Sequence, residues 1–486
     1  MSMHTNQPKN LHHARRFFLK DCGIGLGKLA LAGLLTDQLR GQSPTDSPNA
    51  SQANDPLAPR PPHFPGKAKA VIHLFMAGAP SHLELFDYKP ALSQMDGKPL
   101  PASVTEGQRL AFIRADAAVM GPQFQFARHG QSGMEISDAL PYHAKIVDDI
   151  CLIRSCHTDQ FNHAPAQTFF QTGFAVPGRP SIGSWVTYGL GCETKDLPAF
   201  VVLSTGSGIS GGSGLWSSGF LPSIHTGVRF RNQGDPILNV TNPAGFDSSL
   251  QRDTLDLINA LNQEKLLETK DPEIETRLAN YEMAFRMQAS APELMDLSNE
   301  SKETIELYGC DPSTPSFARA CLLARRMIER GVRYVNIFHE GWDAHSDVVG
   351  NHRGNCKATD QASAALIIDL KNRGLLDETL VVWGGEFGRT PMVESNAALG
   401  RSRGRDHHPK AYSMWLAGGG IRPGLTYGTT DELGYNVIQN PVHVHDIQTT
   451  ILHSLGLDHE RLTFRTQGRD YRLTDVHGQL IHEILS

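Results

Sequence analysis

The stretch DETLVVWGGEFGRTP, residues 377–391, decides how the fold of this chain is interpreted. Residues 379–383 form a run of β-branched and apolar side chains, which is typical of a strand buried on both faces. The run stops at two glycines, which let the backbone turn tightly, and Glu386 and Arg389 follow. A buried strand therefore delivers a carboxylate and a guanidinium to its own end, where they either cap the strand or belong to a functional site.

The size and charge of the chain allow one large α/β domain. The chain has 486 residues, of which 40% are apolar and 20% are charged, so it can bury a large core. The net charge of -6 gives no basic surface for nucleic acid, and we expect no nucleic-acid partner. The 22 histidines permit metal chemistry, and the seven cysteines leave the disulfide pairing open. The oligomeric state cannot be deduced from the sequence.

The N-terminus has the pattern of an export signal. Residues 14–20 (ARRFFLK) contain twin arginines, and a Gly/Ala/Leu-rich stretch follows at 24–35. We expect a twin-arginine signal at 1–40, a disordered proline-rich linker at 41–67 and a single domain at 68–486. This pattern predicts a protein exported to the periplasm, the cell envelope or the medium. No apolar run in the domain is long enough for a membrane span.

Six short apolar runs in the domain are predicted to be strands. They lie at 69–76, 149–154, 199–204, 333–338, 379–383 and 411–416. Helical patterns separate them, most clearly within 250–330 and at 360–373. Apolar strands that alternate with helices favour a mostly parallel central sheet covered by helices on both faces. The ligands of such sheets bind outside the carboxyl ends of the strands.

Histidines and carboxylates collect after the ends of four predicted strands and in the loop that contains GRDHHP. Such a mixture of imidazole and carboxylate ligands suits zinc, manganese or iron. We therefore predict a divalent metal ion, with zinc as the first choice and manganese, iron or calcium as alternatives. The predicted ligands are Asp343, His345, Glu386, His407 and His408.

From Val71 to the C-terminus the chain resembles the domain of unknown function 1501 family. The matching stretches include AGAPSHLELFDYKP, GWDAHSD, TLVVWGGEFGRTP, GRDHHPKAYSMWLAGGGI and PVHVHDIQTTILHSLGL. That family resembles the alkaline phosphatase and sulfatase superfamily, whose members hydrolyse or transfer phosphate and sulfate esters at a two-metal site. The resemblance implies an alkaline-phosphatase-like three-layer sandwich. It also implies a metal-dependent hydrolase whose substrate is a small anionic ester or a sulfated glycan.

The chain departs from the superfamily at the nucleophile. Counting back from the Thr-Gly pair of NHAPAQTFFQTG puts His163 where sulfatases carry their cysteine. We expect a metal-activated water to attack the ester, with Arg389 or Arg405 stabilising the charged oxygens of the transition state. Covalent catalysis by His163, or by a hydroxyl of Ser155 or Thr158, is the alternative mechanism.

Substrate contacts are expected from His82, His157 and Trp216, the last in the glycine-rich segment STGSGISGGSGLWSSG. This segment also matches G-x-S-x-G, but the preceding strand ends too early for the nucleophile elbow of a serine hydrolase. The alternative function is a scaffold without turnover that binds an anionic glycan or an envelope partner. It is suggested by the absence of the superfamily's first-strand aspartate and of a histidine beside Glu386.

Overall fold

The computed structural model describes residues 55–486 apart from 107–109, 115, 207–208, 233–234, 238–241, 243–244 and 397–398. The predicted export signal and the first part of the predicted linker lie outside these residues. The rest of that linker, residues 55–67, is hydrogen-bonded to the domain. Cys192 N–H donates to Leu57 O (2.8 Å), and Arg60 N–H donates to Leu190 O (2.9 Å).

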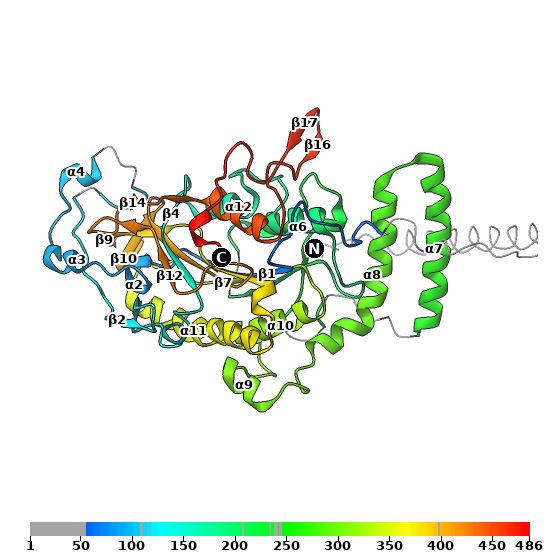
Figure 1. Cartoon of the computed structure of the whole chain (residues 1–486), viewed down its shortest axis with the longest axis horizontal. Coiled ribbons are helices and arrows are strands. Elements are labelled where there is room, and N and C mark those ends of the chain that lie inside the picture. Colours follow the sequence, from blue (N-terminus) through cyan, green and yellow to red (C-terminus); the bar gives the residue numbers. More distant parts are fainter. Residues whose placement is uncertain are drawn as a thin grey trace, which may run out of the picture. The chain divides into compact units, whose positions relative to one another are not determined.

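A nine-stranded sheet forms the centre of the described domain (Figure 1). Its strands are β1 (Ala70–Ala77), β4 (Cys151–His157), β5 (Phe200–Thr205), β6 (Val228–Arg229), β7 (Tyr334–Glu340), β8 (Thr379–Gly384), β11 (Tyr412–Ala417), β12 (Leu425–Tyr427) and β15 (Val442–His443). The order is β12-β4-β11-β8-β1-β7-β5-β6, with β15 paired to β4. Only β11 in this sheet is antiparallel to its neighbours, so the predicted mostly parallel sheet is confirmed.

Helices cover both faces of the sheet, which confirms the predicted layers. Successive side chains of β1 point to opposite faces, because a strand has a period of two. Ile72 and Leu74 join a core that includes residues of α10 (Phe317–Glu329) and α11 (Val348–Asn372). Val71 and Phe75 join a second core, with residues of α5 (His163–Thr172), α6 (Ile182–Leu190) and α12 (Val444–Ser454).

Further helices and two-stranded pairs are added to this three-layer core. The helices are α2 (His82–Leu85), α3 (Pro90–Met95), α4 (Ala102–Thr105), α7 (Ser248–Thr269), α8 (Pro272–Met295) and α9 (Lys302–Tyr308). Two-stranded pairs join β2 (Phe126–His129) to β3 (Met134–Ser137), β9 (Gly388–Asn396) to β10 (Arg401–His408), β13 (Thr429–Thr430) to β14 (Val437–Gln439) and β16 (Phe464–Thr466) to β17 (Arg469–Tyr471). None of the described helices has the length and apolar character needed to cross a membrane. The six cysteines from Cys151 onward are buried and unpaired.

The carboxyl ends of β1, β7 and β8 meet at one edge of the sheet. β1 lies between β7 and β8 and is parallel to both, so their ends are side by side. Gly78, directly after β1, has a φ of +109°, and a Cβ on it would lie 2.5 Å from the backbone nitrogen of Asp343. Only glycine therefore allows the chain after β7 to pass so close to the end of β1.

Candidate metal centre

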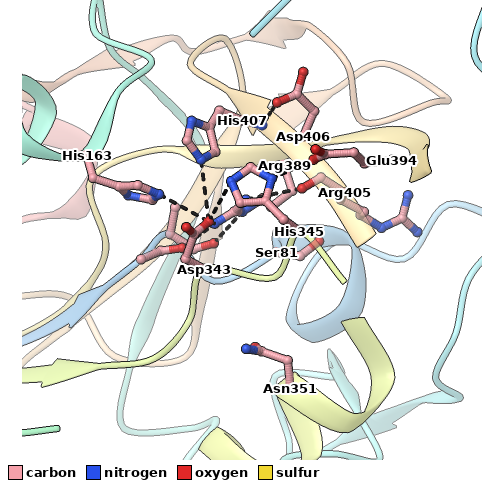
Figure 2. A network of polar contacts seen from close by, with 12 residues as sticks. Ser81, His163, Asp343, His345, Asn351, Arg389, Glu394, Arg405, Asp406 and His407 are labelled. Carbon is pink, nitrogen blue, oxygen red and sulfur yellow. Dashed lines mark hydrogen bonds and ion pairs between the residues drawn. The ribbon is translucent and has the colours of Figure 1, made fainter. Parts of the chain in front are cut away.

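Three imidazoles and one carboxylate meet at this edge of the sheet (Figure 2). His163 opens α5, Asp343 and His345 follow β7, and His407 lies near the end of β10. The Nε2 atoms of the three histidines lie 3.1, 3.0 and 3.4 Å from Asp343 Oδ1, in that order. One donor atom from each of the four residues falls within 4.8 Å of all the others, so the group can hold one ion.

The outer nitrogen of each ring faces an oxygen atom of the protein. The contacts are His163 Nδ1 to Glu386 Oε1 (2.6 Å), His345 Nδ1 to Glu394 Oε2 (2.5 Å) and His407 Nδ1 to Phe161 O (2.8 Å). Carboxylates and carbonyls accept hydrogen bonds, so these contacts favour the tautomer with the proton on Nδ1. The lone pairs of the three Nε2 atoms are then directed towards Asp343, which is how histidines that bind metals are oriented.

The spacing of the donor atoms fits a small metal ion. Zinc lies about 2.0–2.1 Å from nitrogen and oxygen ligands, which puts tetrahedral ligands about 3.3 Å apart. The separations of 3.0–3.4 Å between the Nε2 atoms and Asp343 Oδ1 match that value. His163 Nε2 is buried and lies 3.1 Å from Asp343 Oδ1, without the geometry of a hydrogen bond. A cation between these groups would give that nitrogen a partner.

Asp343 is hydrogen-bonded to a buried arginine, and its side chain is partly exposed to solvent. Its side chain is 42% exposed, whereas Arg389 is fully buried. Arg389 Nη2 donates to Asp343 Oδ1 (2.7 Å), and other donors of its guanidinium go to the carbonyls of Gly78 (2.5 Å), Ala79 (3.0 Å) and Arg405 (3.1 Å). Arg389 therefore orients Asp343 from inside the protein.

The charges of the cluster are strongly coupled. Burial raises the pKa of Asp343, but the facing histidines and the Arg389 charge outweigh it and hold that pKa far below its usual range. Burial lowers the pKa of His163, but Asp343 and Glu386 outweigh it and raise that pKa to about 9. The opposite holds for His407, where burial dominates and lowers the pKa to about 4. A positive charge among these groups is thus favoured, and a metal ion can supply it in place of a proton.

Two of the five predicted ligands lie outside the cluster. Glu386 stands behind His163, where its carboxylate also accepts hydrogen bonds from Gly78 N–H (3.0 Å) and Gln167 Nε2 (3.2 Å). His408 Nε2 lies 2.5 Å from the carbonyl of Tyr435, and burial lowers the pKa of its ring to about 3. The structure thus brings together Asp343, His345 and His407, and it adds His163.

Arg405 is placed away from the candidate centre (Figure 2). Its guanidinium is completely buried and forms an ion pair with the equally buried Glu84 (2.8 Å). Its remaining hydrogen bonds go to the carbonyls of Thr390, Met120 and Gly121. Because these partners occupy the guanidinium, Arg405 stabilises the β9–β10 hairpin and does not face an anion at the cluster.

The three predicted substrate contacts are also placed elsewhere. His82 is buried, with Nε2 3.0 Å from the carbonyl of Gly434. The half-buried ring of His157 packs against His443, with 5.1 Å between the ring centroids. Trp216 is buried in the core, where its ring lies 5.9 Å from that of Phe338.

The hydroxyls that were considered as nucleophiles are engaged in local structure. Ser155 is buried, and its Oγ donates to the carbonyl of Asn440 (2.5 Å). Thr158 Oγ1 accepts a long hydrogen bond from Gln160 N–H (3.5 Å).

Two carboxylates of the site were missed in the sequence. Glu394 holds His345, and it lies on β9, the strand that opens with Gly388 and Arg389. Asp406 precedes His407; it accepts hydrogen bonds from Phe112 N–H (2.7 Å) and His407 N–H (2.8 Å), and burial raises its pKa. The one available signal was the sequence position of Asp406 beside the paired histidines. Glu394 gave none, because its approach depends on how β9 pairs with β10.

Comparison with known proteins gives a family and a set of similar structures. A family model described as "Protein of unknown function (DUF1501)" matches residues 68–485. No curated protein matches the chain. Similar solved structures include the lipoteichoic acid synthase LtaP from Listeria monocytogenes (9% identity, 87% of this chain and 80% of that chain, TM-score 0.34). They also include the alkaline phosphatase of the Antarctic bacterium TAB5 (11%, 80% and 98%, TM-score 0.30) and the phosphonate monoester hydrolase SpPMH from Silicibacter pomeroyi (12%, 71% and 71%, TM-score 0.31).

Proposed function

The chain belongs to the DUF1501 family, and we propose that it is a metal-dependent hydrolase of phosphate or sulfate esters. The observation that carries the proposal is the convergence of three imidazole Nε2 atoms on the solvent-open carboxylate of Asp343. The partners of the outer nitrogens support it, because they hold the rings in the orientation that metal binding needs. The twin-arginine pattern supports the further proposal that the protein is exported.

The four proposed ligands are Asp343, His163, His345 and His407. Three nitrogens and one oxygen suit zinc best, with manganese or iron next, whereas calcium takes six to eight oxygen ligands. A divalent ion held by all four would have to accept a fifth ligand in order to polarise an ester oxygen or to lower the pKa of a water from 15.7 towards about 7. Glu386, Glu394 and Arg389 keep the ligands in position through the hydrogen bonds described above.

The surroundings of the cluster favour an anionic substrate. The guanidinium of Arg401 pairs with Glu394 (2.5 Å), and its side chain is still 23% exposed. This partly exposed cation lies beside Glu394, the partner of the proposed ligand His345, and would attract a negatively charged ester. The buried Arg389 would act indirectly, by holding Asp343.

Water is the proposed attacking group. His163 is engaged on both sides, since Nδ1 is held by Glu386 and Nε2 faces Asp343. An imidazole that serves as a ligand has no free lone pair with which to attack phosphorus or sulfur. The proposal therefore assigns His163 to metal binding instead of covalent catalysis.

Two neighbouring histidines provide the test. The metal-loaded full chain would be assayed with 4-nitrophenyl phosphate and 4-nitrophenyl sulfate, beside the variants His407→Gln and His408→Gln. His407→Gln removes a proposed ligand and is expected to lower kcat/KM by about 100-fold or more. His408→Gln changes a buried ring outside the cluster and should retain activity wherever it is folded. Equal activity of all three proteins would contradict the proposal, and tight metal binding without turnover of either ester would favour the anion-binding scaffold.

A further inference from the structure

An exposed aromatic ring stands directly beside the candidate metal centre. Phe112 is 45% exposed, and its position beside two proposed ligands sets it apart from the other exposed apolar side chains of the described residues. Its ring centroid lies 5.2 Å from that of His345 and 5.4 Å from that of His407, with interplanar angles of 85° and 79°. The ring thus contacts two proposed ligands and still offers apolar surface to the solvent.

The ring is fixed by the same strand that carries His407. Asp406 Oδ2 accepts hydrogen bonds from the backbone N–H groups of Phe112 (2.7 Å) and Ile113 (3.2 Å). Asp406 Oδ1 accepts one from His407 N–H (2.8 Å), so a single buried carboxylate ties the ligand to the aromatic residue. Ile113 packs against a small apolar cluster that includes Leu83. Such anchoring holds the exposed ring in one place relative to the centre.

A cation completes the arrangement. The guanidinium of Arg401 lies over the ring of Phe112, 4.8 Å from its centroid, and pairs with Glu394. Glu394 in turn holds His345, so Arg401, Phe112 and the ligands form one connected surface. This surface offers a positive charge and an apolar ring within one side-chain length of the metal ligands.

We propose that Phe112 determines specificity at this site and that the substrate is an anionic ester whose organic group is a ring. The inference rests on the proposed function and deepens it. The anionic end would face the cluster and Arg401, and the flat side of the ring would pack on Phe112. An aryl ring and the carbon–hydrogen face of a sugar share this chemistry, whereas a small alkyl group would leave the phenyl surface exposed to water.

Phosphonates test the inference without turnover, because they cannot be hydrolysed at the carbon–phosphorus bond by ester chemistry. The zinc-loaded full chain would be titrated calorimetrically with phenylphosphonate, cyclohexylphosphonate and methylphosphonate. We expect phenylphosphonate to bind about 3- to 10-fold more tightly than methylphosphonate, which is the range measured for aromatic pairs. Cyclohexylphosphonate as tight as the phenyl compound would indicate packing of the kind a sugar face makes, and weaker binding would indicate an aryl group.

The variants separate the ring from the centre. Phe112→Ala should retain the bound metal but bind phenylphosphonate and methylphosphonate about equally. Phe112→Tyr, which keeps an aromatic ring, should again prefer the phenyl compound. Phe174→Ala is the matched control, since Phe174 is likewise exposed (39%) with a guanidinium, that of Arg179, 3.9 Å from its ring centroid. Equal binding of the phenyl and methyl compounds, or an unchanged preference in Phe112→Ala, would overturn the inference alone. Absence of binding by every phosphonate would overturn it together with the proposed function.

Discussion

Replacing Glu386 by glutamine perturbs the proposed centre without removing a ligand. The carboxylate accepts hydrogen bonds from His163 Nδ1 (2.6 Å), Gly78 N–H (3.0 Å) and Gln167 Nε2 (3.2 Å). A glutamine side chain has one acceptor oxygen for these three donors and adds two donors of its own. At least one buried N–H group then lacks a partner, which costs about 1–3 kcal/mol of stability in the metal-free protein.

The substitution is also expected to weaken metal binding, because Glu386 holds the proposed ligand His163. Partners that hold a ligand's outer nitrogen change metal affinity by about 10- to 100-fold, which corresponds to about 1.4–2.7 kcal/mol. The affinity of Glu386→Gln for zinc would be measured by competition with a chromophoric chelator. Glu84→Gln is the matched control, because Glu84 is equally buried and pairs with Arg405 outside the cluster. If the two variants bound zinc as tightly as the wild type, the role assigned to Glu386 would be refuted.

Three further substitutions test other parts of the structure. Arg405→Met leaves the buried carboxylate of Glu84 without its partner and should cost about 3–5 kcal/mol in urea unfolding. Burial lowers the pKa of His225 to about 4, below its value of about 6.5 in the unfolded chain, so its contribution to stability is complete above pH 6.5 and is lost as the pH falls towards 4. Between pH 7 and pH 5 the free energy of unfolding of His225→Gln should therefore fall by about 2 kcal/mol less than that of the wild type. Thermal unfolding at each pH measures this difference. Trp216→Ala should lower stability by about 3–5 kcal/mol and leave the KM for esters unchanged, because Trp216 belongs to the core.

The strands of the sheet could be predicted from the sequence because burial on both faces requires continuous runs of apolar residues. All six predicted apolar runs are strands of the central sheet, including β8, which precedes Glu386 and Arg389. A strand that is buried on both faces needs apolar residues at every position, and few other structures require this. The direction of β11 was not predicted, because apolar periodicity is the same in parallel and antiparallel strands.

The details of the cluster depend on geometry that the sequence does not carry. His407 and His408 are neighbours on β10, and adjacent side chains of a strand point to opposite sides. Which of them reaches Asp343 is decided by the pairing of β9 with β10, and that pairing is irregular between Arg405 and His407. A one-residue shift would exchange the two histidines, so the sequence could name the pair without choosing between its members.

The roles of the two glutamates have the same origin. Glu386 was expected to touch the metal because it follows a strand end, and the structure puts His163 between Glu386 and Asp343. Glu394 reaches His345 only because β9 folds back beside β10. A pattern of residue types predicts which side chains lie at a sheet edge. Which of them contact a metal ion and which hold its ligands depends on the directions of the side chains.

Metal content is the most direct test of the central claim. The full chain, exposed to zinc and then dialysed, would be analysed by elemental mass spectrometry beside His345→Ala, with circular dichroism to confirm that both are folded. We predict about one ion per wild-type chain and a loss of that ion in the variant, since His345 supplies one of four convergent donors. A folded wild-type protein without bound metal, or a variant that binds as much metal as the wild type, would contradict the account.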